Sequence, residues 1–238
     1  HVNDGHIFKR FDQELEHLNG LILEMGELAA DQLTKALESL QNEDPEQAYD
    51  IIARDAKLNE LDSKASDEIV RLIAKRQPVA RDLRELIAVG KIVSDLERSG
   101  DEARKIAGLT IRFFEAGEKP PTEEILRDIH QLAEYVCKML QLSMDSFREQ
   151  NLKMAGKVVK RGLKLDNQLQ SIIRRLSTFI MEDPRNIGHF IDIVLGIRAL
   201  ERFGGHAKNI AGHIVFIETG ADVRHVGDDE FLQNIRKR

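Results

Sequence analysis

The 238-residue chain has a single cysteine, Cys137, no tryptophan and five prolines. One thiol cannot form an internal disulfide or a cysteine-based zinc site, so the sequence predicts a reducing compartment. Aromatic residues make up 5% of the chain, and runs that alternate Val or Ile with polar residues are scarce. Because Leu, Ala, Glu, Lys and Arg dominate instead, the composition favours helices over strands.

Long apolar runs and an excess of basic charge are also missing. The longest apolar runs are far shorter than the roughly 20 residues that a membrane-spanning helix needs. The sequence also lacks a basic segment followed by an apolar one, the pattern that indicates a signal peptide. The 41 acidic residues outnumber the 35 basic ones, which gives a formal charge of −6. Such a surface has no net attraction for nucleic acid or anionic lipid, so we expect neither as a direct partner.

The prolines lie almost entirely where helices are expected to begin or end. Asp44 before Pro45 is typical of a capping residue followed by proline at the first helical position, and Asp183 before Pro184 repeats the pattern. Between these boundaries, apolar and small residues recur every three or four positions, as in 83–110. The predicted helices are at about 6–42, 45–75, 80–116, 122–149, 152–181 and 185–219.

An internal repeat divides the chain into two similar halves. Residues 97–108 read ERSGDEARKIAG, and residues 201–212 read ERFGGHAKNIAG, with seven of twelve positions identical at an offset of 104. A weaker match at an offset of 107 pairs residues 48–58 with 155–165. Short connections between long helices make neighbours antiparallel. We therefore predict an all-α fold, a tandem repeat of two antiparallel three-helix bundles related by a pseudo-two-fold axis. The predicted units are residues 6–117 and 122–219, followed by a polar tail at 220–238.

The repeat singles out Glu97 and Asp101, which lie one helical turn apart on the same face. Two carboxylates at this spacing can hold a hard cation such as magnesium, calcium, manganese or iron. A surface ion pair is the alternative, because Lys105 lies four residues beyond Asp101 and Arg104 lies three beyond it. On spacing alone, the ion pair is the more economical interpretation.

The second copy of the motif differs at the acidic turn. It keeps Glu201 but has Gly205 where Asp101 stands, followed by His206. A metal bound there would have one ligand fewer, or would use His206 or water instead. Gly204 and Gly205 inside a helix cost stability, so they predict close backbone packing or a bend at this point.

Four segments, at 74–107, 181–186, 199–211 and 222–230, resemble the PhoU family. The resemblance covers nearly the whole chain and implies tandem three-helix bundles, in agreement with the six helices predicted above. It identifies Glu97 and Asp101 with the first metal motif of the family and Glu201 with the second. The second acid of that motif is Gly205 here, so His206 remains a candidate substitute.

The resemblance also implies a function. Members of this family are cytoplasmic regulators of phosphate uptake and phosphate-starvation signalling. They negatively modulate the high-affinity phosphate ABC transporter and its sensor histidine kinase. We therefore expect a non-catalytic regulator whose partners are the transporter's ATPase subunit, the kinase and a second copy of the chain. Such a homodimer would be peripheral to the membrane only through those partners. The implied cofactors are divalent or ferric ions, with Fe, Mn, Mg, Zn and Ca not distinguished.

Two alternatives come from the residues alone. The carboxylate pair is compatible with a metal-dependent phosphohydrolase or a metal-storage bundle. A helical spacer needs neither metal nor signalling partner. No phosphate-loop pattern, nucleophile elbow or dinucleotide fingerprint appears in the sequence, which favours a regulator over an enzyme.

Overall fold

The computed structural model describes residues 2–115, 120–221 and 232–233, and within them every long element is an α-helix. The all-α prediction with six long helices is confirmed, and a short 3-10 helix additionally precedes the last one. Most of the predicted tail at 220–238 lies outside the described residues. The elements are α1 (Val2–Gln41), α2 (Pro45–Arg76), α3 (Ala80–Phe114), α4 (Glu123–Glu149), α5 (Leu152–Glu182), η1 (Pro184–His189) and α6 (Phe190–Thr219).

Polar side chains cap several helices where the sequence changes from turn to apolar repeat. Asp44 accepts a hydrogen bond from the Gln47 amide at 3.2 Å, directly before the proline that opens α2. Asn151 accepts one from the Lys153 amide at 3.0 Å and caps α5. These bonds satisfy amide groups that have no partner inside the helix, which fixes where each helix begins.

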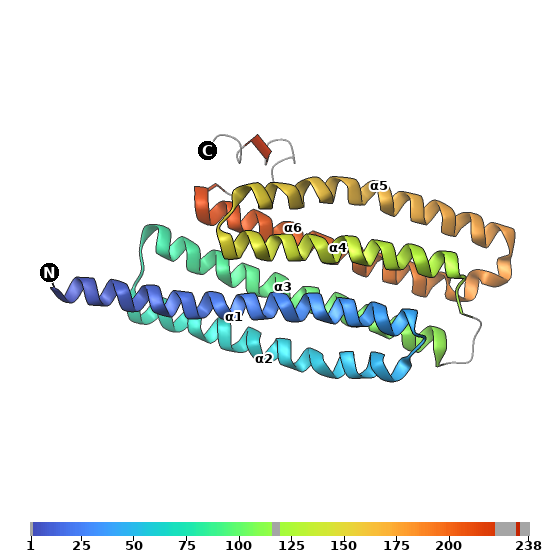
Figure 1. The fold of residues 1–238 in the computed structure, drawn as a ribbon, viewed down its shortest axis with the longest axis horizontal. Coiled ribbons are helices and arrows are strands. Elements are labelled where there is room, and N and C mark those ends of the chain that lie inside the picture. The colour runs from blue at the N-terminus through green and yellow to red at the C-terminus, as the bar shows by residue number, and fades with distance from the viewer. Residues whose placement is uncertain (1, 116–119, 222–231, 234–238) are drawn as a thin grey trace.

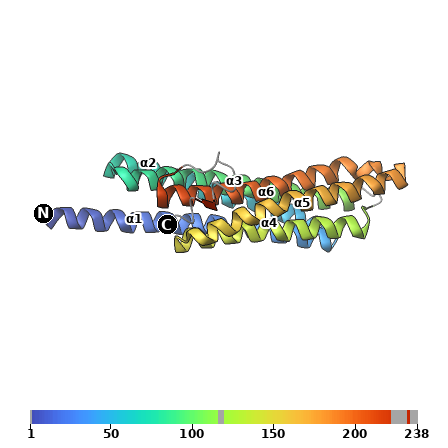
Figure 2. The same cartoon turned by 90° about the horizontal axis from the view of Figure 1, so that it is seen from above.

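The helices form two bundles that lie lengthwise side by side (Figures 1 and 2). Helices α1, α2 and α3 contact one another, as do α4, α5 and α6, while α3 against α6 and α1 against α4 join the bundles. None of the described helices is long and apolar enough to cross a membrane. Because α3 and α6 carry the repeated motif, the two copies of that motif meet at the junction between the bundles.

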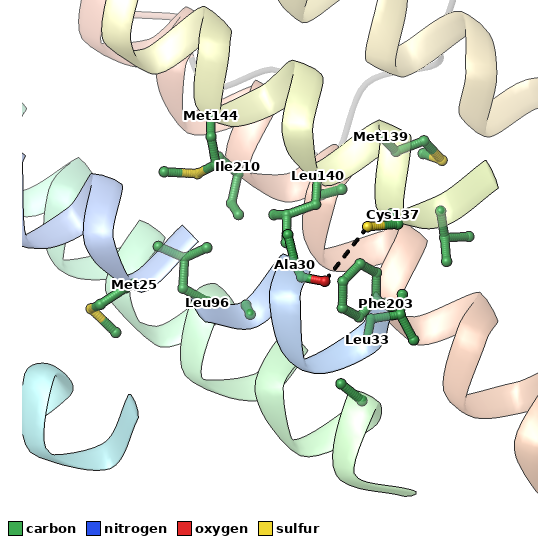
Figure 3. Packing of buried hydrophobic residues seen from close by; sticks show 14 of the residues in the cluster. Met25, Ala30, Leu33, Leu96, Cys137, Met139, Leu140, Met144, Phe203 and Ile210 are labelled. Carbon is green, nitrogen blue, oxygen red and sulfur yellow. Dashed lines mark hydrogen bonds between the residues drawn. The ribbon is translucent and has the colours of Figure 1, made fainter. Parts of the chain in front are cut away.

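The two bundles share one continuous apolar core. Figure 3 shows side chains from α1, α3, α4 and α6 meeting in it, among them Leu33, Leu96, Met144 and Phe203. Cys137 lies in the same core, with its sulfur 3.8 Å from the carbonyl oxygen of Ala30. The junction is therefore built like the interior of a single domain.

Helices α3 and α6 run antiparallel along this junction. As the residue number rises in α3, the number of the partner in α6 falls. Ser99 and Phe203, which are equivalent in the repeat, are both fully buried near the middle of the series. An approximate two-fold axis between the helices accounts for this order. We call this junction between α3 and α6 the seam, and its polar contacts include Arg84–Ile217, Asp95–His213, Glu102–Arg202 and Arg112–Asp192.

Candidate metal site

The structure brings the predicted pair together and adds a third carboxylate. Glu97 and Asp101 of α3 lie close enough for their negative charges to repel each other, and Asp55 of α2 lies beside Asp101. Burial and the negative charge of Asp101 raise the pKa of Glu97. Burial and the same charge raise the pKa of Asp55. Three carboxylates on two helices therefore form one acidic cluster, which we call the α2–α3 cluster.

A basic side chain partly neutralises the α2–α3 cluster. Arg104 places Nη1 3.5 Å from Oδ2 of Asp55 and Nη2 3.4 Å from Oδ1 of Asp101. The Arg104 side chain is 45% exposed, whereas that of Asp55 is 5% exposed. The Arg104 guanidinium can turn into solvent, but the buried Asp55 carboxylate then needs another positive charge beside it. The surface ion pair expected between Asp101 and a basic neighbour is thus formed by Arg104, and Lys105 pairs with Glu102 instead.

Two buried polar groups beneath the cluster have no hydrogen-bond partner in the described structure. One is Oδ1 of Asp55, and the other is the side-chain amide of Gln32 in α1. A β-carbon added to Gly100 would lie 3.3 Å from that oxygen of Asp55 and 3.1 Å from Oε1 of Gln32. Glycine at position 100 thus lets polar atoms of α1 and α2 approach the backbone of α3.

The chemistry of the donors fits a hard cation. Carboxylate and amide oxygens are the ligands that Mg²⁺, Ca²⁺ and Mn²⁺ prefer, and the unpartnered oxygen of Asp55 is free to bind one. As the side chains stand, no three His, Cys, Asp or Glu residues within the described ranges are arranged to hold one ion. Binding therefore requires Arg104 to swing away and the carboxylates to turn toward a common point.

The equivalent place in the second bundle has lost two of its three acids. Glu201 is 43% exposed and pairs with Arg198 at 3.3 Å. Gly205 replaces the aspartate and faces open space, and Gly162 stands where Asp55 does in the first half. The predicted ligand Glu201 therefore stands without a second acid from the repeat.

His206 points away from Glu201 and across the seam. Its Nδ1 lies 3.1 Å from Oδ1 of Asp95 in α3, and Nε2 of His213 lies 3.1 Å from Oδ2 of the same carboxylate. This differs from the expectation that His206 replaces the missing acid. Five residues apart on a helix, Glu201 and His206 lie on different faces. The structure thus assigns His206 to a contact between the bundles.

Asp95 is the centre of this inter-bundle contact. Burial disfavours its charged form, but hydrogen bonds from His206 and His213 outweigh burial and lower the pKa of Asp95 to about 2. Asn209 adds a third donor at 3.4 Å. A charged carboxylate is therefore held between the bundles by donors from α6.

The sequence carried a signal for the residues that were missed. Gln32 and Asp55 occupy positions of the apolar three-and-four pattern, between Ala29 and Ala36 in α1 and between Ile51 and Leu58 in α2. A polar residue in such a stripe is buried once the bundle forms. Asp95 follows the same rule in α3.

Comparison with known proteins agrees with this arrangement. The family model described as "PhoU domain" matches the chain twice, over residues 22–110 and 129–214. The chain belongs to the PhoU family. The two matches fall on the two bundles, so each bundle is one PhoU domain.

Named PhoU relatives match almost end to end. A "Phosphate-specific transport system accessory protein PhoU homolog" of Pseudomonas aeruginosa is 36% identical over 222 residues, which is 93% of this chain and 90% of the relative. The accessory protein PhoU of Escherichia coli is 32% identical over 225 residues, covering 94% of this chain and 92% of the relative. The similarity therefore extends over both PhoU domains.

Solved PhoU structures have the same fold. The crystal structure of PhoU from P. aeruginosa aligns with a TM-score of 0.82 at 36% identity, covering 89% of this chain and all of that one. The phosphate transport system regulatory protein PhoU from Streptococcus pneumoniae gives 0.81 at 29% identity, covering 90% and 99%. Both alignments include the two bundles together.

Proposed function

We propose that the chain is a non-catalytic regulator of phosphate transport that acts in the cytoplasm. The observation that carries this proposal is the near end-to-end match to proteins named as accessory to the phosphate-specific transport system. The regulator restrains the high-affinity phosphate ABC transporter and keeps the sensor histidine kinase silent when phosphate is plentiful. Its partners are the transporter's ATPase subunit, the kinase and a second copy of the chain, with which it forms a homodimer.

Complementation and crosslinking test this role. In a bacterial strain that lacks its own PhoU gene, the chain is expected to repress a phosphate-starvation reporter when phosphate is plentiful. Crosslinking in phosphate-replete cells is expected to recover the ATPase subunit, the kinase or both. A reporter that stays active, together with recovery of neither partner, would contradict the proposal.

We further propose that the α2–α3 cluster binds a hard cation and that the bound ion regulates partner binding. Asp55, Glu97 and Asp101 supply carboxylate oxygens, and the unpartnered Asp55 oxygen supports this role. When bound, the cation neutralises the carboxylates and so changes the charge that α2 and α3 present to a partner. The affinity for the ATPase subunit is expected to change when a chelator removes the ion, and equal affinities would contradict this step.

A metal-dependent phosphohydrolase is the second candidate, and the α2–α3 cluster is the observation in its favour. Purified protein loaded with Mn²⁺ would then hydrolyse a generic phosphate ester. Glu97→Gln and Asp101→Asn must abolish that hydrolysis, because they remove the ligands. A rate that these variants leave unchanged excludes catalysis at the cluster.

A further inference from the structure

We infer that Gln32 of α1 is a ligand in the α2–α3 cluster, where its amide oxygen joins the carboxylates of α2 and α3 around a hard divalent cation of the Ca²⁺ and Mn²⁺ class. This inference rests on the proposed cation site and deepens it in two ways. It adds α1 to the helices that hold the ion, and it restricts which metals the site accepts.

The first reason is the cost of leaving the Gln32 amide unpaired. The residue is 4% exposed, and neither its oxygen nor its nitrogen has a hydrogen-bond partner in the described parts of the chain. An unsatisfied buried polar group destabilises the fold, because it loses its hydrogen bonds to water and gains none. Leucine at this position of the apolar stripe would avoid that cost. An amide here is therefore explained by a ligand that it binds.

The second reason is that oxygen atoms from different helices converge near Gly100. Oε1 of Gln32 and Oδ1 of Asp55 both lie within 3.3 Å of the point where a β-carbon on Gly100 would stand. Gly100 directly precedes Asp101 and lies three residues after Glu97. Oxygens from α1, α2 and α3 thus gather around one turn of α3. They range from the deeply buried Gln32 to the partly exposed Asp101.

The third reason is the second bundle, where two of the three acids and the amide are missing together, while Glu201 is kept. Gly204 is the counterpart of Gly100, and its immediate neighbours are the side chains of Leu165, Val136 and Met139. The Leu165 contact repeats the contact of Leu58 with Gly100, so the packing is equivalent. Only the polar atoms differ. Joint loss of two carboxylates and the amide is what a shared ligand role predicts.

The donor atoms restrict which metal ions the site can bind. An amide oxygen adds a ligand without adding a further negative charge, and Ca²⁺ commonly takes Asn and Gln carbonyls among six to eight oxygens. Mg²⁺ usually keeps several waters and binds through one or two carboxylates. Zn²⁺ favours imidazole and thiolate, which the α2–α3 cluster lacks. We therefore expect Ca²⁺ and Mn²⁺ to bind more tightly than Mg²⁺ or Zn²⁺.

Calorimetric titration of the full chain with Ca²⁺, Mn²⁺, Mg²⁺ and Zn²⁺ tests the inference. Gln32→Leu is expected to weaken Ca²⁺ and Mn²⁺ binding by roughly 10- to 100-fold. Gln32→Glu keeps an oxygen at the site and is expected to retain binding. Gln41→Leu, an exposed change on the same helix, is the matched control and is expected to bind like the wild type.

The cation-free protein gives a second readout that a purely structural role would not produce. With chelator present, Gln32→Leu is expected to unfold at the same or a higher urea concentration than the wild type, because the unsatisfied amide is gone. Weaker binding together with equal or higher intrinsic stability supports the ligand role. Loss of stability in the chelated protein, or unchanged affinity, overturns it.

The remaining outcomes separate this inference from the proposals it rests on. Wild-type protein that binds none of the four ions but still represses the starvation reporter overturns the cation site and the role of Gln32, while the regulatory function stands. Wild-type protein that binds Zn²⁺ most tightly overturns the metal class. Binding that needs Glu97 but not Gln32 overturns the ligand role alone.

Discussion

The same repeat position carries a glutamate in both halves of this molecule, but the two glutamates have different surroundings. Glu97 is partly buried and lies close to the charge of Asp101, and both effects raise its pKa. Glu201 occupies the equivalent position, but it is 43% exposed and pairs with Arg198. The repeat places both residues on the same turn, so the difference comes from their neighbours.

Removing the charge of Glu97 should therefore stabilise the cation-free protein. In chelator at neutral pH, Glu97→Gln is expected to increase the free energy of unfolding by a few tenths of a kcal/mol, about the cost of like charges one turn apart. Glu201→Gln is the matched control, and it is expected to give no gain. Urea unfolding followed by circular dichroism measures both, and equal gains in the two variants would refute the crowding at Glu97.

Asp95 has the opposite electrostatic situation, because its pKa is lowered to about 2 by His206 and His213. A lowered carboxylate pKa stabilises the fold above the ordinary value of 3.8, and this contribution is lost as the pH falls toward 2. Asp95→Asn is expected to reduce stability at pH 7 by about 1–3 kcal/mol, since both histidines lose a charged acceptor.

The dependence of stability on pH in the acid range tests the role of Asp95. Between pH 4 and pH 2 the wild type is expected to lose stability more steeply than Asp95→Asn. Asp192→Asn is the matched control, because Asp192 also pairs across the seam, with Arg112, but both side chains are more exposed. It is expected to cost no more than about 1 kcal/mol. Equal costs for the two variants would contradict a special role for Asp95.

The helices could be predicted from the sequence, but the faces through which they pack on one another could not. Proline and capping residues fix the boundaries of α2 and α5, and the three-and-four pattern extends between them. An apolar stripe shows that a face is buried but does not show which helix covers it. The pairing of α3 with α6 therefore could not be derived, and neither could the direction of His206, which depends on that pairing.

The acidic pair of the candidate site was predictable, because it needs one helix only. Glu97 and Asp101 are neighbours on any helix. Asp55 and Gln32 come from α2 and α1, and their approach depends on how three helices pack around Gly100. Polar residues inside an apolar stripe were the available clue. They indicate burial, but they do not name the partner.

The two adjacent glycines of α6 should respond in opposite ways to an added methyl group. A β-carbon on Gly204 would lie 2.8 Å from Leu165, whereas one on Gly205 meets nothing within 4 Å. Gly204→Ala is expected to destabilise the protein by about 1–3 kcal/mol through overpacking. Gly205→Ala is expected to stabilise it by about 0.5–1 kcal/mol, the usual preference of a helix for alanine.

Each glycine variant is the control for the other, because the sequence change and the helix are the same. Thermal and urea unfolding of both proteins measure the difference. Stabilisation by both variants would show that α5 does not pack closely on Gly204. Destabilisation by both would show that Gly205 is also in contact.

For the molecule as a whole, the shared core predicts that the two PhoU domains unfold together. Both bundles contribute to one apolar cluster, and the seam adds buried polar contacts such as Asp95–His213. Tyr49 in α2 and Tyr135 in α4 are the two tyrosines of the chain, and tryptophan is absent. Each domain therefore carries its own fluorescent reporter.

Variants with one tyrosine test this cooperativity. Tyr135→Phe leaves Tyr49 to report on the first domain, and Tyr49→Phe leaves Tyr135 to report on the second. After correction for the stability change of each variant by circular dichroism, the two fluorescence transitions are expected to coincide with the loss of helix. A fluorescence midpoint that precedes the loss of helix would show that one domain opens first.

The antiparallel seam between α3 and α6 has a consequence for how the molecule can specialise. If the same seam joined two separate copies of one shorter chain, every substitution would appear on both flanks at once. Covalent linkage removes that restriction, so Asp101 on one side coexists with Gly205 on the other. The two bundles of a nearly symmetric scaffold therefore present different side chains. A binding partner can distinguish one bundle from the other.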